Sequence, residues 1–247
     1  MSTTSPFRPV SRQSLSESVY LQLKDRIVRR ELTAGAALPS ERELSEALGV
    51  NRGAVREAIK RLQQAQLVAV RQGGNHVVLN YLDEAGLELL PSLLLDKRGR
   101  VNGAAVRSIM AMRSALAPDI AGAAAEHGGA GQAEEQQALL KQMRAAGSDI
   151  GALQNHCFEF WKALVAASDN IAFRLAFNSM QRTYRQVWGL LTRVMEAEFR
   201  DLAGLGRIAR AVAAGDAEAA RTAGRRHVEI GRRALERTLD AGSSEGG

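Results

Sequence analysis

Apolar residues in the first third of the chain recur at helical spacing in three separate runs. The first run predicts a helix that begins at residue 14 and fades near residue 31. The second predicts a short helix that starts at a capping box formed by Ser40 and Glu43 and stops at Gly49. The third predicts a helix with Asn51 as its N-cap. The apolar positions of the three runs are Val19, Leu23 and Ile27, then Leu44, Ala47 and Leu48, then Val55, Ala58, Ile59 and Leu62.

Two β-rich runs, residues 67–70 and 77–79, flank a turn that contains Gly73 and Gly74. Such a pattern predicts a β-hairpin. Helix, short helix, tight turn, helix and hairpin is the order of a winged helix-turn-helix. We therefore predict a winged helix-turn-helix domain over residues 14–80, preceded by a flexible arm over residues 1–13.

Beyond about residue 83 no strand-like run occurs, and Ala-, Leu- and Arg-rich helical patterns continue toward the end of the chain. One helix is predicted after Val101 and is broken by the glycines near residue 128. Others are predicted over residues 150–167, after Asn170 as N-cap, and on both sides of Gly215. The whole chain is thus expected to be mainly α, with an all-α helical bundle over residues 81–240 and a disordered tail over residues 241–247.

Net charge is concentrated in the predicted N-terminal domain. Residues 1–80 contain 12 Lys and Arg against 7 Asp and Glu, which accounts for most of the overall net charge of +6. This asymmetry favours a polyanionic partner for that domain, although a basic solvated face is the commoner explanation of such a pattern. The single cysteine, Cys157, excludes an intramolecular disulfide framework and fits a reducing cytoplasm. Because no targeting segment or long apolar stretch is present, we expect a cytoplasmic protein without a membrane partner.

The start of the third helix has the chemistry needed to read DNA. Arg52 and Arg56 lie one turn apart there, and arginine bonds bidentately to guanine edges in the major groove. Gly53 and Ala54 are small enough to let the backbone approach a duplex. Arg42, near the start of the preceding helix, is placed for a phosphate or an adjacent base. Either arginine alone is better explained as an ordinary surface residue, but the ordered set favours DNA binding.

Residues 38–50, LPSERELSEALGV, and residues 51–59, NRGAVREAI, resemble the signature of the GntR family of bacterial regulators. The resemblance covers residues 14–79 and implies a symmetric homodimer on a palindromic operator, with recognition helices in the major groove and wing tips in the minor groove. Asn51, Gly53 and Ala54 stand where relatives often have hydroxyl side chains, and Gly74 replaces a frequently polar residue. Carried over by position, the DNA contacts fall on Arg42, Asn51, Arg52, Gly53, Ala54, Arg56, Gln72 and Gly73.

The helical C-terminal part resembles that of the FadR subfamily. The matching segments are residues 112–119, residues 160–170, and residues 211–216 followed by His227. Most members of that subfamily hold a metal with one acidic residue and three histidines. Here the first two histidine positions fall on Trp161 and near Leu205, so only His227 remains. The resemblance therefore implies an apolar pocket, and we expect neither a metal nor another cofactor.

Loss of the metal histidines resembles the fatty-acyl-CoA-responsive members of the subfamily. It implies a fatty acyl-CoA or a fatty acid as effector, with a small organic acid as the rival. Glu229 and Arg233, however, stand where those proteins have small and aromatic ligand contacts. The candidate ligand-binding residues are Arg113, Trp161, Tyr184, Trp188 and His227.

Each ligand candidate also has a structural explanation. His227 lies on an apolar stripe and is equally well explained as a core histidine. Arg113 is equally well explained by a salt bridge with Asp119 or Glu126, and aromatic residues at bundle spacing are more often core than ligand contacts.

The sequence thus predicts a homodimeric, ligand-responsive transcription regulator, most simply a repressor, with activation at some promoters as the alternative that the sequence leaves open. An architectural DNA-binding protein whose helical domain only dimerises is the alternative from another class. Enzyme activity is not expected, because the chain contains no Walker motif, nucleophile elbow or dinucleotide fingerprint. His156 and Cys157 are adjacent on one helix, so their side chains point about 100° apart and do not form a nucleophile–base pair.

Overall fold

The computed structural model describes residues 15–71, 75–95 and 100–244. The chain forms two compact units, Met1–Gly99 and Arg100–Gly247. The sequence placed the domain boundary near residue 80, whereas α4 (Tyr81–Glu84), the 3₁₀ helix η1 (Leu87–Leu89) and α5 (Leu90–Leu93) belong to the first unit. Leu89 explains the difference, because it is buried in the core of the first unit.

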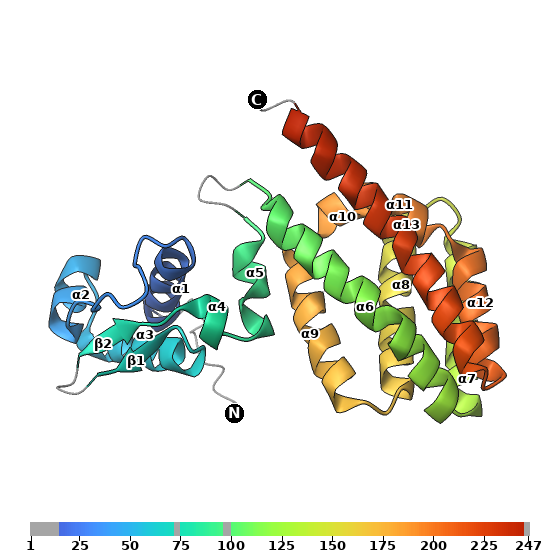
Figure 1. Cartoon of the computed structure of the whole chain (residues 1–247), viewed down its shortest axis with the longest axis horizontal. Coiled ribbons are helices and arrows are strands. Elements are labelled where there is room, and N and C mark those ends of the chain that lie inside the picture. Colours follow the sequence, from blue (N-terminus) through green and yellow to red (C-terminus); the bar gives the residue numbers. More distant parts are fainter. Residues whose placement is uncertain (1–14, 72–74, 96–99, 245–247) are drawn as a thin grey trace, which may run out of the picture. The chain divides into compact units, whose positions relative to one another are not determined.

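The first unit is built on three helices, labelled in Figure 1: α1 (Leu15–Val28), α2 (Glu41–Leu48) and α3 (Arg52–Gln64). The predicted apolar faces of α1 and α3 are buried and form one core with Leu44 of α2. Each buried Leu, Ile or Val side chain stabilises the fold by roughly 1.5–3 kcal/mol. This core fixes α3 against α1 and leaves the opposite face of α3 exposed.

The hairpin consists of β1 (Val68–Val70) and β2 (His76–Val78), paired antiparallel with Val68 opposite Val78. The outer edge of β2 is also paired. The Gly35 amide donates to the Val78 carbonyl at 2.8 Å, and the Leu38 amide donates to the His76 carbonyl at the same distance. The sequence predicted only a loop before α2, whereas this loop ties the hairpin to the helices.

The second unit is a helical bundle, as predicted. The longest helices, α6 and α13, lie side by side and run in opposite directions (Figure 1). None of the helices among the described residues is long and apolar enough to cross a membrane. The helices of this unit are α6 (Gly103–His127), α7 (Ala130–Ala146), α8 (Ile150–Ala167), α9 (Ile171–Gln186), α10 (Trp188–Val194), α11 (Glu196–Phe199), α12 (Leu202–Ala213) and α13 (Ala217–Ser244).

Several helix boundaries match the sequence prediction, and three features differ. The predicted helix over residues 150–167 is α8, and Asn170 caps α9 through bonds from the Ala172 and Phe173 amides. The apolar stripe expected to continue through Val187 is instead divided there into α9 and α10. The helix α7 was not predicted. The last helix, α13, continues to Ser244, beyond the point where a disordered tail was expected.

Candidate functional site

The start of α3 is shaped by Asn51. Its side-chain oxygen accepts a hydrogen bond from the Ala54 amide at 2.9 Å, as expected for an N-cap. This cap makes Arg52 the first residue of the helix. Arg52 and Gly53 are exposed, and no ion pair restrains Arg52 within the described part of the chain. The helix therefore begins with a free cationic side chain at its exposed end.

The turn between α2 and α3 depends on Gly49. This residue caps α2 in the left-handed conformation, with φ of 64°, which a glycine adopts without strain. At the other end of α2, the Ser40 hydroxyl accepts from the Glu43 amide and the Ser40 amide donates to the Glu43 carboxylate, so the predicted capping box is present. Both ends of α2 are thus fixed by local bonds, which sets the angle at which α3 leaves the turn.

The other predicted arginines are exposed and paired with acidic side chains. Arg56 donates to both carboxylate oxygens of Glu41, at 3.2 Å from Nε to Oε1 and 2.9 Å from Nη2 to Oε2. This bond lowers the pKa of the Glu41 carboxyl and raises that of Arg56. Arg42 pairs with Glu46 at 3.2 Å on the surface of α2.

Two further cationic residues of α3 differ in their placement. Arg61 contacts Glu17 of α1 and lies 4.2 Å from the centroid of the Tyr20 ring. It therefore joins α1 to α3. Lys60 is exposed. The predicted contacts Gln72 and Gly73 lie outside the described residues.

In the second unit, a cavity of about 40 Å³ lies among α6, α8, α9, α10 and α11. Arg113, Trp161 and Tyr184, three of the predicted ligand residues, line it. Burial raises the pKa of the Tyr184 hydroxyl to about 12, so this group stays protonated and neutral. The remaining lining is mostly apolar and consists of Leu116, Ala117, Ile120, Cys157, Phe158, Phe177, Met180, Gln181, Leu191, Met195, Glu198 and Phe199.

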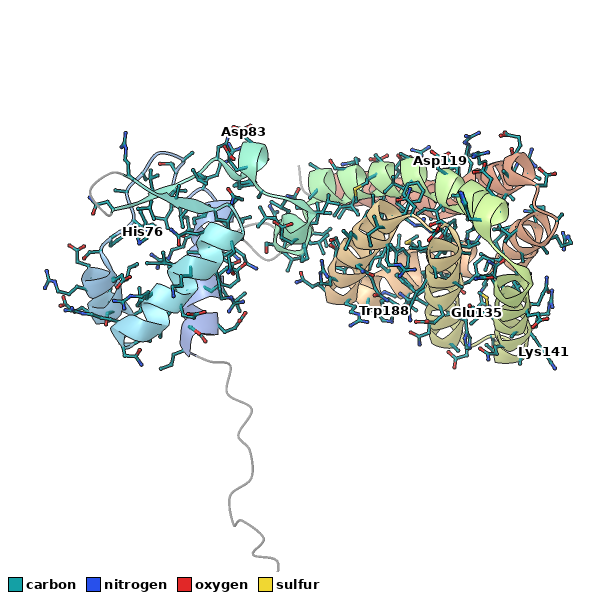
Figure 2. The ribbon with its side chains drawn as sticks, turned by 90° about the horizontal axis from the view of Figure 1, so that it is seen from below. His76, Asp83, Asp119, Glu135, Lys141 and Trp188 are labelled. Atoms are coloured by element: carbon teal, nitrogen blue, oxygen red, sulfur yellow. The ribbon has the colours of Figure 1, made fainter. Side chains whose placement is uncertain are left out.

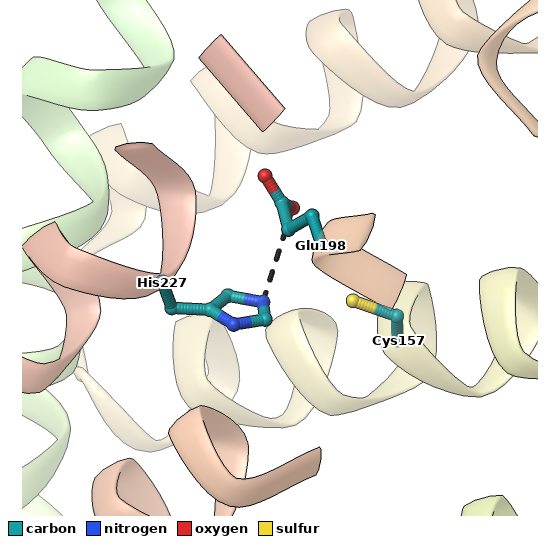
Figure 3. A group of neighbouring side chains, drawn as sticks. All are labelled: Cys157, Glu198 and His227. Atoms are coloured by element: carbon teal, nitrogen blue, oxygen red, sulfur yellow. Dashed lines mark ion pairs between the residues drawn. The ribbon is translucent and has the colours of Figure 1, made fainter. Parts of the chain in front are cut away.

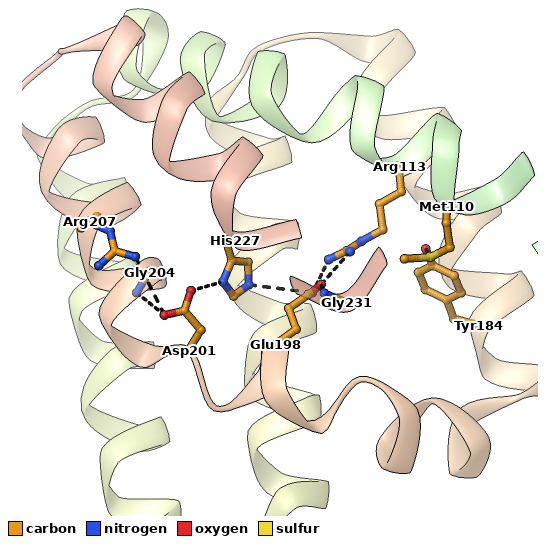
Figure 4. Close-up of polar contacts among 9 residues, drawn as sticks. All are labelled: Met110, Arg113, Tyr184, Glu198, Asp201, Gly204, Arg207, His227 and Gly231. Atoms are coloured by element: carbon orange, nitrogen blue, oxygen red, sulfur yellow. Dashed lines mark hydrogen bonds and ion pairs between the residues drawn. The ribbon is translucent and has the colours of Figure 1, made fainter. Parts of the chain in front are cut away.

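Arg113 makes a buried ion pair across the bundle. Its guanidinium donates from Nη1 to Glu198 Oε2 at 2.9 Å and from Nη2 to Glu198 Oε1 (Figure 4). The side chain of Glu198 is fully buried, and Oε2 also accepts from the Gly231 amide at 3.1 Å. A Cβ atom at position 231 would overlap this carboxylate, so the contact requires a glycine. The partner of Arg113 is therefore Glu198, while Asp119 and Glu126 pair with Arg221.

His227 continues this polar chain from Glu198 to Asp201, as Figure 4 shows. Its Nδ1 donates to Asp201 Oδ2 at 3.1 Å, and its Nε2 lies 3.8 Å from Glu198 Oε1. Asp201 also accepts from the Gly204 amide at 2.8 Å and so caps α12. Burial alone would raise the pKa of Asp201, but the bonds from His227 and Gly204 outweigh it and lower that pKa. His227 is fully buried and does not line the cavity.

Cys157, Glu198 and His227 are close enough to offer three ligand atoms to one metal ion (Figure 3). The chemistry of these donors does not fit a metal. The Glu198 carboxylate is already bound by Arg113 and by the Gly231 amide, so a metal ion would have to displace a buried guanidinium cation. Trp161 and Leu205, at the two positions where the resemblance places histidines, are both buried and have no ligand atom.

Trp188, the last predicted ligand residue, is on α10 and is labelled in Figure 2. Its ring lies 4.7 Å from that of Phe158, which lines the cavity, but Trp188 itself does not. Its carbonyl accepts from Gln154 at 3.3 Å. Trp188 therefore supports one wall of the cavity from behind.

Sequence reasoning missed Glu41, Glu198 and Asp201. Each is a carboxylate that holds a predicted residue, and each is far from its partner in sequence, by 15, 85 and 26 residues. No local spacing signals such a pair. Glu229, which was noted as a departure from the acyl-CoA-responsive pattern, pairs instead with Arg232 and Arg233 on α13, and these bonds lower its pKa to about 2.

Both units of the chain match known protein families. Residues 15–78 match the family model described as bacterial regulatory proteins, gntR family, and residues 108–230 match that of the FCD domain. The chain is 36% identical over 230 residues to the HTH-type transcriptional regulator Mce2R of Mycobacterium tuberculosis, covering 92% of this chain and 94% of that protein. The chain belongs to the GntR family of bacterial transcription regulators. Its C-terminal unit is an FCD domain, the effector domain of FadR-like members, and these relatives are regulators rather than enzymes.

Two further likenesses are more distant. The fatty acid metabolism regulator protein of Yersinia pestis is 27% identical over 153 residues, which cover 62% of each chain. A solved structure of Lar, described as controlling the expression of the agr system of Listeria monocytogenes, has a TM-score of 0.57 and 17% sequence identity to this chain. The match covers 92% of this chain and 99% of the Lar chain. The second likeness concerns the fold alone.

Proposed function

We propose that this GntR-family regulator is a homodimeric repressor that reads a palindromic operator through α3. The observation that supports the proposal most directly is the exposed start of α3, where the Asn51 cap presents Arg52. In this proposal Arg52 reads a guanine edge. Arg56, Gly53 and Ala54 lie beside it at the base pairs, and Arg42 contacts the backbone. Gln72 and Gly73 are also proposed to contact the minor groove, because their positions match those of DNA-contacting residues in the GntR family.

The effector of this regulator is proposed to bind in the cavity of the FCD domain and to be a fatty acyl-CoA or a fatty acid. The mostly apolar lining supports this, as does the name of the Yersinia relative. At about 40 Å³ the cavity has room for a few water molecules, whereas benzene requires on the order of 150 Å³. Effector binding must therefore enlarge the cavity.

The wall best suited to move is formed by α10. This short helix lies between the breaks at Val187 and Met195, and Leu191 and Met195 line the cavity there. The next helix, α11, is held in place by the buried Glu198–Arg113 pair. A ligand that binds only the form with the enlarged cavity stabilises that form. The difference between its affinities for the two forms sets how far operator binding is weakened. A small organic acid is the rival effector.

The DNA-binding part of the proposal is tested without knowing the operator in advance. The full-length protein selects its preferred duplex from a random library, and affinity for that duplex is compared between wild type, Arg52→Ala and Lys60→Ala. Loss of one bidentate contact, on the order of 1–3 kcal/mol, predicts a roughly 5- to 150-fold loss of affinity for Arg52→Ala, with relaxed preference at one base pair of each half-site. Lys60→Ala is expected to weaken specific and nonspecific binding equally. Unchanged selectivity in Arg52→Ala would contradict the role of Arg52.

The effector part is tested by titrating acyl-CoA thioesters and fatty acids of increasing chain length into the protein–operator complex. Release of the duplex, with a raised melting temperature of the free protein, is the expected result. If no compound of either series changes melting or operator affinity, the helical domain has the purely structural role of an architectural protein.

A further inference from the structure

The indole of Trp161, a residue that lines the cavity, has an unused hydrogen-bond donor. Trp161 lies on α8, is only 6% exposed and lines the cavity, yet its Nε1–H has no hydrogen-bond partner among the described residues. The ring is held from one side by His227, at 6.1 Å between ring centroids and with the two planes 30° apart. Buried donors are almost always paired in folded proteins. An unpaired one beside a cavity points to an acceptor atom that comes from a ligand or from water.

The charged groups of the cavity are already neutralised. Among the described residues, the charged side chains that line it are Arg113 and Glu198, and they bond to each other through two N–H···O contacts. The Glu198 carboxylate is fully buried, and the Arg113 guanidinium balances its charge there. A second carboxylate brought into the cavity would compete with Glu198 for one cation. The cavity is therefore electrostatically unsuited to an anionic head group.

The remaining polar side chains of the lining, those of Tyr184, Cys157 and Gln181, are uncharged and do not change this balance. The Tyr184 hydroxyl donates to Met110 Sδ at 3.8 Å, a weak acceptor. The Cys157 thiol is buried and neutral, because burial raises its pKa. The lining thus offers a spare neutral donor on Trp161 but no unpaired cation.

We propose that the effector has a neutral hydrogen-bond acceptor, such as the carbonyl of an ester or thioester, on an apolar body, and that the Trp161 Nε1–H donates to it. This inference rests on the proposed effector cavity and specifies the class of molecule that enters it. A thioester-linked acyl chain fits the description, whereas a free fatty acid or a small organic acid does not. Trp161 would then be the residue that determines which head group is accepted.

The charge part of this inference is tested on the wild-type protein. Methyl esters from acetate to decanoate are titrated beside the matched carboxylates at pH 7.5, and binding is followed by calorimetry and by the shift in melting temperature. At the best chain length the ester is expected to bind at least about 10-fold more tightly than its acid. Tighter binding of the acids would overturn the neutral-head inference and leave the effector cavity standing. If neither series binds nor changes operator affinity, both the inference and the proposed effector function fail.

The donor is tested with the two tryptophans of the chain as a matched pair. Trp161→Phe keeps an aromatic ring but removes the N–H, and it is expected to lower ester affinity about fivefold, as for loss of one hydrogen bond. Trp188→Phe makes the same change outside the cavity lining, so ester affinity should fall clearly less than in Trp161→Phe. It also leaves Trp161 as the only tryptophan, whose fluorescence should then change on ester binding. Equal affinities in both variants, or an unchanged Trp161 spectrum, would contradict the assignment.

Discussion

Arg56 at the exposed face of α3 is bonded to both carboxylate oxygens of Glu41, the first residue of α2. Arg52, one turn earlier on the same helix, is not restrained in this way within the described residues. The two arginines predicted to face DNA therefore differ. Arg52 is free to reach a base. Arg56 must either break its bonds to Glu41 to contact DNA, or contact DNA from the position in which Glu41 holds it.

Glu41→Gln is expected to tighten binding to DNA of any sequence, because it removes a negative charge from the DNA-facing surface and frees Arg56 for a phosphate. The salt dependence of binding should steepen by about one unit of slope. Melting should hardly change, because the pair is exposed to solvent. Glu57→Gln on α3 is the control, since it makes the same charge change but leaves the Arg56–Glu41 pair intact. Equal effects in both variants would show that net charge, and not release of Arg56, is responsible.

Asn51→Ala is expected to destabilise the protein by about 1 kcal/mol, because the Ala54 amide loses its cap. Operator affinity should fall as well, since the first turn of α3 then frays beneath Arg52. Urea unfolding measures the first effect and operator titration the second. Asn51→Ser, which retains a capping oxygen, should restore most of both. Equal stabilities of the Ala and Ser variants would argue that the cap has no influence.

Breaking the buried pair between Arg113 and Glu198 should be far more damaging than any surface change. Arg113→Met leaves a fully buried carboxylate without its cation, and loss of one partner of such a pair costs about 3–5 kcal/mol. The double variant Arg113→Met with Glu198→Met removes both charges and should regain much of the loss in urea unfolding. A double variant less stable than Arg113→Met would show that the pair is not the source of the effect.

Acid should weaken the FCD domain partly through Asp201. Its pKa is lowered in the folded state by His227 and Gly204, against the effect of burial. The stabilisation is therefore complete above the unfolded pKa, near 3.9, and is lost as pH falls through the lower folded value. Asp201→Asn keeps the cap of α12 but cannot titrate. Its free energy of unfolding should be lower at pH 7 and should decline less between about pH 5 and pH 3; parallel curves for the two proteins would contradict this.

Features encoded within a few residues could be predicted from the sequence. The Ser40–Glu43 capping box, the Asn51 and Asn170 caps and the bounds of α8 depend on neighbouring residues, so local spacing was sufficient for them. Arg52 was placed correctly on the exposed side of α3 for the same reason.

Features that depend on packing between distant segments were missed. Arg61 lies at the edge of the apolar face of α3. Its contacts with Glu17 and Tyr20 depend on how α1 packs against α3, which local spacing does not reveal. Glu198 belongs to a four-residue helix without a clear pattern, and its role depends on α6 and α13 meeting there. The end of α9 at Val187 could not be predicted, because the apolar stripe of the sequence continues across it into α10.

The burial of Cys157 has a consequence for the conditions under which the regulator works. Its thiol is only 2% exposed, and burial raises its pKa, so it remains protonated within the bundle. Peroxides and disulfide exchange act on accessible thiolates. Oxidative stress in the cell should therefore leave this sulfur untouched, so Cys157 does not give this regulator a redox response.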